Sequence, residues 1–561
     1  MAKKPIWGET NILKSASIMG LATFISRVMG LVRELVFAVY FGAGNFTDAF
    51  HVAFRIPNLL RDLFAEGAMS ASLVPTFTQV QVEEGEQRAW RVAGLVFRIL
   101  FFLVGGLAFF GILFAPQLVS FYASAFKQIP GKFELTVQMT RIMFPFFPCV
   151  ALAAAFMGIL NACGIFFIPA FSSALFNITS IGVGVVCVQI FSGWGSDWKI
   201  QPIVGMAFGV LVGGGVQAFC QLPFLYQVGY RWVSKKSGDP SWFEDPSLRK
   251  ILGMMIPGTI GLAATQVNLL VNTILATSQG PGAVSWLNYA FRLMQFPIGI
   301  FGVSLASATL TQISQQLARK DIQGVSQTLT QSLRSVFAVN LPAASALIFL
   351  GFPIIELIFQ YGRFYPEDAQ ATARALAMYA VGLVSYSMVK VLVPVCYALG
   401  NTKLPVLSSF LTVGLTIGLN LVMSKTLGYW GLALGTSIAA LFNGCFLMGV
   451  VRSLIFKQGG QFPLSPIFKG LLGYLSVALF MGTLCYYSEV FLRIQLSDQM
   501  FFLRIGRMGT VLARSIRMIL LVFEGVLVFL MVSKIFRLQE ASYFTNIFVK
   551  KMKNKLRRSS T

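Results

Sequence analysis

The sequence has little charge and almost no histidine for its length. Charged residues make up 12% of the 561 residues, whereas soluble proteins carry roughly 25%, and hydrophobic residues reach 56%. His51 is the only histidine, which argues against the common zinc sites and Ser-His-Asp catalysis because both use imidazole. The seven cysteines form no C-x-x-C motif, so no cysteine-based metal or redox site is expected. These scarcities predict a membrane protein that needs no metal or other cofactor and is not an enzyme.

The excess of basic residues does not indicate a nucleic-acid-binding protein. The formal net charge is +23, but the basic residues are spread along short loops and the C-terminal tail, without an aromatic-interleaved basic domain. The N-terminus resembles a signal peptide, with Lys3 and Lys4 before an apolar stretch. Arg27 and Arg33 follow without a small-x-small cleavage site, which predicts a retained first span.

Apolar stretches long enough to cross a bilayer recur along the chain. We count about fourteen stretches of roughly 20 residues, the length that crosses a hydrocarbon core. These must be helices, because the bilayer offers no water to satisfy free backbone groups. Lysine and arginine concentrate in loops that lie inside if both termini are cytoplasmic, as the positive-inside rule requires. One group disagrees, because it precedes the last span on the predicted outer side: Arg493, Arg504, Arg507, Arg514 and Arg517.

Three motifs recur in the same order in the two halves of the chain, which indicates an internal repeat. The pairs are Ala53-Phe54-Arg55 with Ala290-Phe291-Arg292, Ala162-x-Gly164 with Ala398-x-Gly400, and Gly205-x-Ala207-x-Gly209 with Gly431-x-Ala433-x-Gly435. An even number of spans in each half gives equivalent helices the same direction. This parallel repeat is the plan of many secondary transporters, whose substrate site lies between the halves.

We therefore predict an all-α polytopic membrane protein of about fourteen transmembrane helices, in two parallel six-helix repeats plus two extra helices. The expected parts are an N-terminal six-helix lobe at 1–227, a cytoplasmic linker at 228–249, a C-terminal six-helix lobe at 250–456, two extra transmembrane helices at 457–536 and a basic cytoplasmic tail at 537–561.

Charged and polar residues accumulate inside the predicted membrane spans. The candidate site residues are Arg27, Arg33, Glu34, Asp48, Arg55, Asn58 and Arg61 from the first two spans, and Arg292 from span 8. Asp48, Arg55 and Asp62 are spaced to share one stripe of a helix. An arginine at the bilayer centre costs about 2.5–3.5 kcal/mol, so each needs a partner or a cavity.

Two explanations of these arginines remain open. Intramembrane ion pairing would join Arg27 to Glu34, and Arg55 to Asp48 or Asp62. This does not balance the whole set, because the arginines outnumber the nearby carboxylates. Arginine binds phosphate through planar, bidentate hydrogen bonds, so the surplus suggests a phosphate-bearing substrate.

Several motifs resemble one known family. They are Ser26-Arg-Val-Met-Gly-Leu-Val-Arg-Glu34, Phe41-Gly-Ala-Gly44, Pro57-Asn-Leu-Leu-Arg61 with Phe64-Ala-Glu-Gly-Ala68, Tyr289-Ala-Phe-Arg-Leu-Met294 and Gln360-Tyr-Gly-Arg-Phe364. They closely resemble the MurJ (MviN) family of bacterial lipid II flippases, within the multidrug/oligosaccharidyl-lipid/polysaccharide exporter superfamily. The resemblance runs over essentially the whole chain, and it carries the family's cavity arginines onto Arg27, Arg33, Arg61 and Arg292, and a family aspartate onto Asp48.

The resemblance implies a transporter of two six-helix lobes, with two additional helices that form a groove for a lipid tail. Its substrate would be lipid II, the undecaprenyl-diphosphate-linked disaccharide pentapeptide. It would move lipid II from the inner to the outer face of the bacterial cytoplasmic membrane by alternating access, with both termini cytoplasmic. Membrane lipids and cell-wall synthesis proteins are the further partners it implies, and nucleic acid is not expected.

The sequence departs from the family at two points. Phe291 stands where relatives often have an acidic residue before the arginine of span 8, which leaves the partner of Arg292 open. Asn268, Asn272 and Asn420 stand where some relatives bind sodium through carboxylates. We therefore do not expect sodium binding, and membrane potential acting on a cationic cavity is the alternative driver.

Three other functions compete with this interpretation. An exporter of another lipid-linked oligosaccharide or of drugs could share the fold, but cationic drugs would favour an acidic cavity. An intramembrane enzyme acting on a lipid diphosphate should show clustered metal-binding carboxylates or a histidine nucleophile, whereas the carboxylates here alternate with arginines. A scaffold gives no reason to place arginines in the bilayer.

Overall fold

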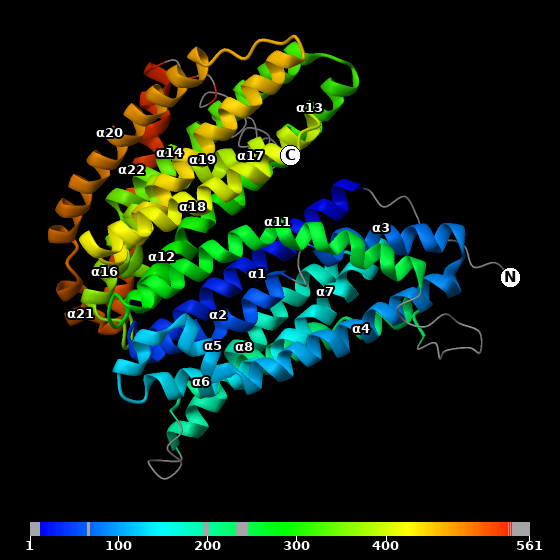
Figure 1. The fold of residues 1–561 in the computed structure, drawn as a ribbon. Helices are drawn as coiled ribbons and strands as arrows, with labels where there is room; N and C mark the ends of the chain where they lie inside the picture. Colours follow the sequence, from blue (N-terminus) through cyan, green and yellow to red (C-terminus); the bar gives the residue numbers. More distant parts are fainter. Residues whose placement is uncertain are drawn as a thin grey trace, which may run out of the picture. The chain divides into compact units, whose positions relative to one another are not determined.

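The computed structural model describes residues 12–63, 68–193, 201–231, 245–536, 538 and 540. Throughout these residues the regular elements are helices, so the all-α prediction is confirmed. The chain divides into two compact units, Met1–Ser285 and Trp286–Thr561, which are described separately (Figure 1). Nearly all of the basic tail predicted at 537–561, and most of the linker predicted at 228–249, lie outside the described residues.

The first unit contains eleven α-helices and a short 3-10 helix within its described part. They are α1 (Ile12–Phe41), α2 (Asn45–Arg61), α3 (Ala68–Glu83), α4 (Glu86–Leu113), α5 (Ala115–Tyr122), η2 (Ser124–Gln128), α6 (Lys132–Met143), α7 (Phe146–Ala162), α8 (Phe167–Gly193), α9 (Val204–Phe219), α10 (Leu222–Gln227) and α11 (Pro246–Thr277). α8 packs against both α9 and α1. Buried side chains of α1, α2, α6, α7, α8 and α9 form one core cluster around Phe37, Phe50 and Phe146.

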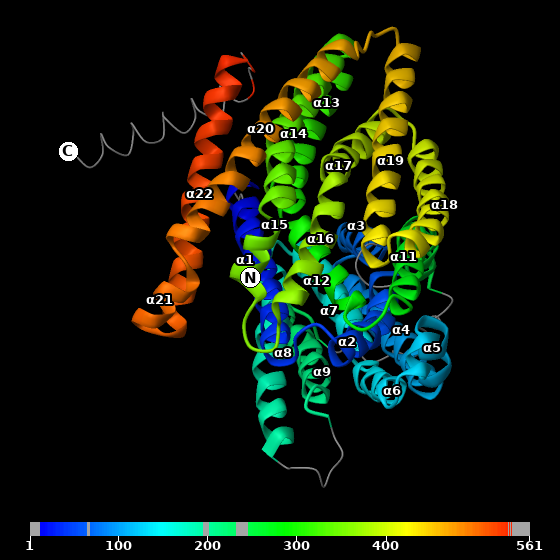
Figure 2. The same cartoon turned by 90° about the vertical axis from the view of Figure 1, so that its left-hand side faces the viewer.

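The second unit is built around α14, α17 and α19. Its helices are α12 (Ala283–Pro297), whose first residues belong to the first unit, the π-helical η4 (Ile298–Gly302), α13 (Val303–Ala318), α14 (Ile322–Phe349), α15 (Gly351–Phe359), α16 (Pro366–Val381), α17 (Leu383–Ala398), α18 (Lys403–Thr426), α19 (Tyr429–Lys457), α20 (Ser465–Gln495), α21 (Asp498–Ile505) and α22 (Arg507–Ile535). Leu333, Val391 and Val451 are fully buried in its core. The two extra spans, α20 and α22, lie side by side (Figure 2).

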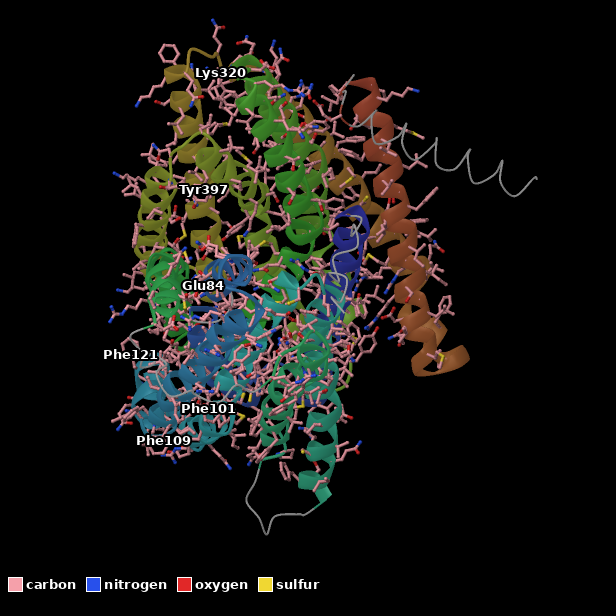
Figure 3. The ribbon with its side chains drawn as sticks, turned by 90° about the vertical axis from the view of Figure 1, so that its right-hand side faces the viewer. Glu84, Phe101, Phe109, Phe121, Lys320 and Tyr397 are labelled. Carbon is pink, nitrogen blue, oxygen red and sulfur yellow. The ribbon has the colours of Figure 1, made fainter. Side chains whose placement is uncertain are left out.

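Ten of the described helices or continuous helix pairs are long and apolar enough to cross a membrane, and the bent pair α16 and α17 makes an eleventh. α1, with 30 residues, and α11, with 32, also have the length of a span. The number of candidate spans is therefore compatible with the predicted fourteen. Large apolar side chains point outward along α4 and the short α5 that follows it: Phe101 and Phe109 of α4 and Phe121 of α5 are more than half exposed (Figure 3). Such a surface suits lipid and would be unfavourable in water.

The repeated motifs form the same local structure in both halves. α7 ends at Ala162 and α17 at Ala398, and the glycine two residues later has a positive φ in each case, 78° at Gly164 and 81° at Gly400. The next N–H group reaches back to a helix carbonyl, over 2.9 Å from Ile165 and 3.0 Å from Asn401. This is the left-handed helix ending that glycine favours.

The third repeated motif lets two helices approach closely. A methyl group in place of the Gly205 hydrogen would meet the backbone of α8 at 2.7 Å. Gly431 and Gly435 have no room for a side chain against α18 either. The glycines thus set the packing of α9 on α8 and of α19 on α18.

The position of α11 differs from what the repeat alone would suggest. This helix packs against α3, with further contacts to α2, α4 and α5, so it belongs to the first compact unit. Asp245 caps its first turn by accepting hydrogen bonds from the N–H groups of Ser247 and Leu248, and its other oxygen lies 2.7 Å from an Arg88 nitrogen of α4. The boundary predicted at 250 from the repeat stays a prediction, because packing and repeat boundaries need not coincide.

Candidate functional site

Arg33 is a buried cation in the middle of α1. It is 5% exposed and pairs with Glu34, whose Oε1 lies 3.2 Å from an Arg33 terminal nitrogen. The guanidinium carbon lies 5.4 Å from the ring of Phe54 on α2 and 5.7 Å from the ring of Phe176 on α8. Glu34 and the two aromatic faces therefore offset the cost of burying this charge.

Asp62, directly after α2, accepts hydrogen bonds from three residues. Arg61 donates to its Oδ1 from Nε at 3.1 Å and from a terminal nitrogen at 2.8 Å. Asn58 and Gln266 of α11 each donate to the other oxygen over 3.4 Å. Arg61 and Asp62 are each about one-fifth exposed, so this cluster is open to a ligand.

Asp48 occupies a closed site near the start of α2. Its side chain is fully buried and accepts from Lys132 Nζ at 3.2 Å, Gly282 N at 2.7 Å, Ser285 N at 3.0 Å and Ser285 Oγ at 2.7 Å. Lys132 also donates to Asn45 at 3.0 Å and lies 3.9 Å from the Phe126 ring centre. With four donors on two oxygens, Asp48 joins α2, α6 and the start of α12. Its contacts are those of a structural group.

The remaining predicted residues have different surroundings. Arg27 is exposed on α1 and makes no hydrogen bond or ion pair within the described part of the chain. Arg55 is half-buried on α2, close enough to Tyr122 of α5 for an electrostatic interaction. Arg292 is half-buried on α12 in the second unit. Its position across a cavity from Arg55 stays a prediction.

The ion pairs suggested by sequence spacing are different in the structure. Glu34 pairs with its neighbour Arg33 rather than with Arg27. Asp48 pairs with Lys132, and Asp62 with Arg61, so neither carboxylate is the partner of Arg55. Lys132 and Gln266 are the contacts that sequence reasoning missed. Both come from helices far along the chain, and neither lies in a local motif that could have revealed it.

The three asparagines singled out in the sequence, Asn268, Asn272 and Asn420, form side-chain hydrogen bonds. Asn272 donates to Asn268 on α11 over 3.4 Å. Asn420 is buried on α18 and donates to Thr436 of α19 over 3.4 Å. Within the described residues no group of three or more histidine, cysteine, aspartate or glutamate side chains could hold a metal ion.

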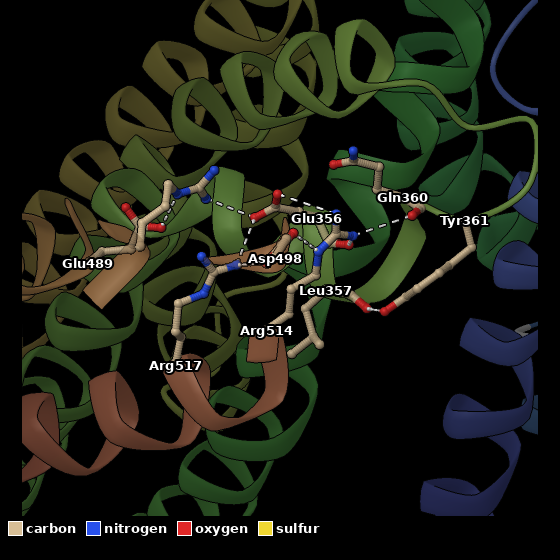
Figure 4. A network of polar contacts seen from close by, with 9 residues as sticks. Glu356, Leu357, Gln360, Tyr361, Glu489, Asp498, Arg514 and Arg517 are labelled. Atoms are coloured by element: carbon tan, nitrogen blue, oxygen red, sulfur yellow. Dashed lines mark hydrogen bonds and ion pairs between the residues drawn. The ribbon is translucent and has the colours of Figure 1, made fainter. Parts of the chain in front are cut away.

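The arginines that break the positive-inside pattern form an ion-pair network in the second unit (Figure 4). Glu356 of α15 is 5% exposed and lies 2.8 Å from Arg493, 3.6 Å from Arg514 and 4.0 Å from Arg517. Asp498 lies 2.8 Å from Arg514 and 2.7 Å from Arg517. A further acid, Glu489, pairs with Arg493, so three carboxylates balance three guanidinium groups. The side chains of Arg504 and Arg507 are outside the described residues.

Comparison with known proteins agrees with this architecture. Residues 37–506 match the family described as "Lipid II flippase MurJ". A "Lipid II flippase MurJ" of Burkholderia cenocepacia is 35% identical over 78% of this chain and 83% of its own. A "Probable lipid II flippase MurJ" of Buchnera aphidicola subsp. Schizaphis graminum is 34% identical over 77% of this chain and 82% of its own.

Solved structures show the same fold. The chain is similar to "Lipid II flippase MurJ, inward closed conformation", with a TM-score of 0.74 and 25% identity over 92% of this chain and 98% of that one. An inward-facing MATE-family multidrug transporter of the MOP superfamily matches with a TM-score of 0.65 at 15% identity, over 79% of this chain and 99% of that one, a likeness of fold alone.

The fold defines a polytopic helical membrane protein with the architecture of the transporter structures named above. Within this class, the chain belongs to the MurJ lipid II flippase family.

Proposed function

We propose that this protein is a flippase that carries lipid II from the inner to the outer leaflet of the bacterial cytoplasmic membrane by alternating access. The membership in the MurJ family supports the substrate, and the charge balance of the first unit supports the mode of binding. Both termini lie in the cytoplasm in this proposal, as the distribution of basic residues favours.

The single observation that carries the binding site is the surplus of arginine once Asp48 is accounted for. Lys132 neutralises Asp48, so among the described candidates only Glu34 and Asp62 remain to balance four arginines of α1 and α2. Guanidinium groups therefore outnumber carboxylates among these residues, and Arg27 makes no hydrogen bond or ion pair within the described part of the chain. A diphosphate diester provides negative charge and acceptor oxygens that match guanidinium geometry.

The arginines take different roles in this proposal. Arg27, exposed and without a partner among the described residues, is the first guanidinium that the diphosphate meets. Arg61 shares its carboxylate with Asn58 and Gln266, so it can exchange Asp62 for phosphate at modest cost. Arg33 and Arg55 belong to the same set of arginines in the first unit, and Arg292, in the second unit, stays a predicted substrate-binding residue. Glu34 positions Arg33, and Asn58 positions Asp62. Asp48 is a positioning residue that holds α2 in place.

A net basic site also separates this function from drug export. Cationic drugs would be repelled by the surplus positive charge, whereas a lipid-linked diphosphate is attracted. Cell-wall synthesis proteins as partners stay a prediction.

Replacement of the arginines in cells tests the proposal. Arg27→Ala, Arg33→Ala, Arg61→Ala and Arg292→Ala should each fail to sustain growth of cells depleted of their own lipid II flippase, with lipid II retained in the inner leaflet. The lysine variants should recover only part of the activity, because lysine lacks the planar fork. Arg319→Ala, a change at an exposed arginine at the end of α13, is the matched control. Alanine variants that reach the membrane at normal levels and flip lipid II at the normal rate would refute the site.

A further inference from the structure

A pocket with one arginine in its lining lies at the C-terminal end of α19, in the second unit and on different helices from the candidate flippase site. Its volume is about 560 Å³, and its lining residues are Gly449, Arg452, Ser453, Phe456, Gln461, Phe462 and Pro463. The last two turns of α19 form one wall. The chain that returns toward α20 forms the other.

The returning wall is fixed by the protein core. Phe462 is 5% exposed and belongs to the core cluster of the second unit. The carbonyl oxygen of Gln461 accepts a hydrogen bond from Ser326 Oγ of α14 at 2.5 Å. Gly459 has a φ of 80°, and a side chain at Gly460 would meet Ile322 at 2.5 Å. The pocket is therefore already formed before any ligand binds.

The pocket carries positive charge that the protein itself does not use. Arg452 is exposed and makes no hydrogen bond or ion pair within the described part of the chain, and none of the lining residues is acidic. Arg452 does not hydrogen-bond to the last carbonyl oxygens of α19. Those oxygens accept hydrogen bonds from the backbone N–H groups of Gln458, Gly459 and Gly460. Asp321, the acid next to Ile322, accepts from the N–H of Gly324 at 2.8 Å. Arg452, with Ser453 and Gln461 beside it, thus presents donors for an anion.

The position of the pocket relative to the membrane selects the kind of anion. α19 and α20 are both candidate membrane spans, and only residues 458–464 join them, so the pocket lies where two spans leave the bilayer. Phe456, 75% exposed, stands at its rim, where an aromatic ring lies against the glycerol and acyl region of lipids.

We infer that this pocket binds the phosphate headgroup of an anionic phospholipid. Arg452 pairs with the phosphate, Ser453 and Gln461 hydrogen-bond to it, and the acyl chains pass beside Phe456. A zwitterionic lipid is a poorer ligand, because its own ammonium group competes with Arg452 for the phosphate. By the distribution of basic residues the lipid belongs to the cytoplasmic leaflet.

Gly449 offers a test that fills the pocket without changing its charge. A side chain at this position of α19 would meet nothing within 4 Å, so Gly449→Leu projects into the pocket and leaves the helix intact. Gly418→Leu on α18 is its matched control, since Gly418 is also helical, exposed and free of neighbours within 4 Å. For charge, Arg452→Gln is compared with Arg319→Gln, a change at another exposed arginine at a helix end.

Native mass spectrometry of the purified full chain, with added phosphatidylglycerol or phosphatidylcholine, measures the binding. The wild type should retain one phosphatidylglycerol more tightly than phosphatidylcholine. Arg452→Gln should weaken it by about tenfold, the effect expected from loss of one charge-assisted hydrogen-bonded contact. Gly449→Leu should weaken it by a similar factor, because the leucine side chain occupies the space of the lipid. Both control variants should bind as the wild type does.

Other outcomes would overturn the inference. Equal retention of phosphatidylcholine would show that charge does not select the lipid. Unchanged phosphatidylglycerol binding in both pocket variants would place the lipid elsewhere. Competition by millimolar inorganic phosphate as strong as that by the lipid would identify the ligand as a free anion. None of these measurements depends on flipping, so they leave the proposed function to its own test.

Discussion

The buried pair of Asp48 and Lys132 should respond asymmetrically to loss of either partner. Asp48→Asn removes the negative charge and leaves the Lys132 ammonium, within the described residues, beside neutral oxygens such as that of Asn45 and beside the Phe126 ring. Lys132→Met removes the positive charge, but Asp48 keeps the donors of Gly282 and Ser285.

The expected magnitudes follow from these contacts. An uncompensated buried charge costs about 3–5 kcal/mol of stability, so Asp48→Asn should lose an amount in this range. Hydrogen bonds to a charged group contribute about 1.5–3 kcal/mol each, and three of them continue to stabilise Asp48 after Lys132→Met. The lysine variant should therefore lose clearly less. The double variant should lose less than the two single changes together, because it leaves neither charge alone.

Thermal unfolding of the purified protein in detergent, followed by size-exclusion chromatography, measures the stability of these variants relative to the wild type. Lys127→Met is the control, since Lys127 is an exposed lysine of the neighbouring 3-10 helix whose ammonium group hydrogen-bonds to Ser120. A Lys132→Met variant as unstable as Asp48→Asn, or a strictly additive double variant, would refute the reasoning.

Three further predictions concern the rest of the molecule. Glu356→Gln should lower the unfolding temperature more than Asp498→Asn, because Glu356 is the more buried acid of the network and faces three arginines; equal shifts would contradict this. Gly400→Ala should destabilise the protein by about 1 kcal/mol or more, since φ is positive there, whereas Gly418→Ala in a helix should not; thermal unfolding of both variants decides. Flipping of lipid II by the reconstituted protein should be insensitive to replacing sodium with potassium at constant membrane potential. The flipping rate should fall when the potential is collapsed, because one charge moved through 100 mV is worth about 2.3 kcal/mol. Loss of flipping on sodium removal would show an ion site.

The features that could be predicted from the sequence are those encoded over short distances. The length of each span and each copy of a repeated motif, such as those that contain Gly164 and Gly400, depend on residues a few positions apart. The candidate arginines of α1 and α2 can also be identified locally, because a charged residue within an apolar stretch is recognisable from the sequence alone.

The choice of partners could not be predicted in this way. Asp48 pairs with Lys132, 84 residues away, and Asp62 contacts Gln266, 204 residues away. The cationic side chain that pairs with a given carboxylate depends on how the helices pack against one another. Hydrophobic periodicity along one helix does not specify how that helix is aligned with its neighbours. The apparent charge anomaly at Arg493, Arg514 and Arg517 has the same origin, since Glu356 reaches it from α15.

The network around Glu356 has a consequence for how the last two spans enter the membrane. Glu489 and Asp498 belong to the same hairpin as the arginines, and they pair with Arg493, Arg514 and Arg517 without help from the rest of the chain. In the predicted topology, with both termini cytoplasmic, this turn crosses the bilayer during synthesis and brings its own counter-charges, which lowers the cost of translocating three guanidinium groups. Glu356, made earlier, is then already in place to receive the inserted hairpin.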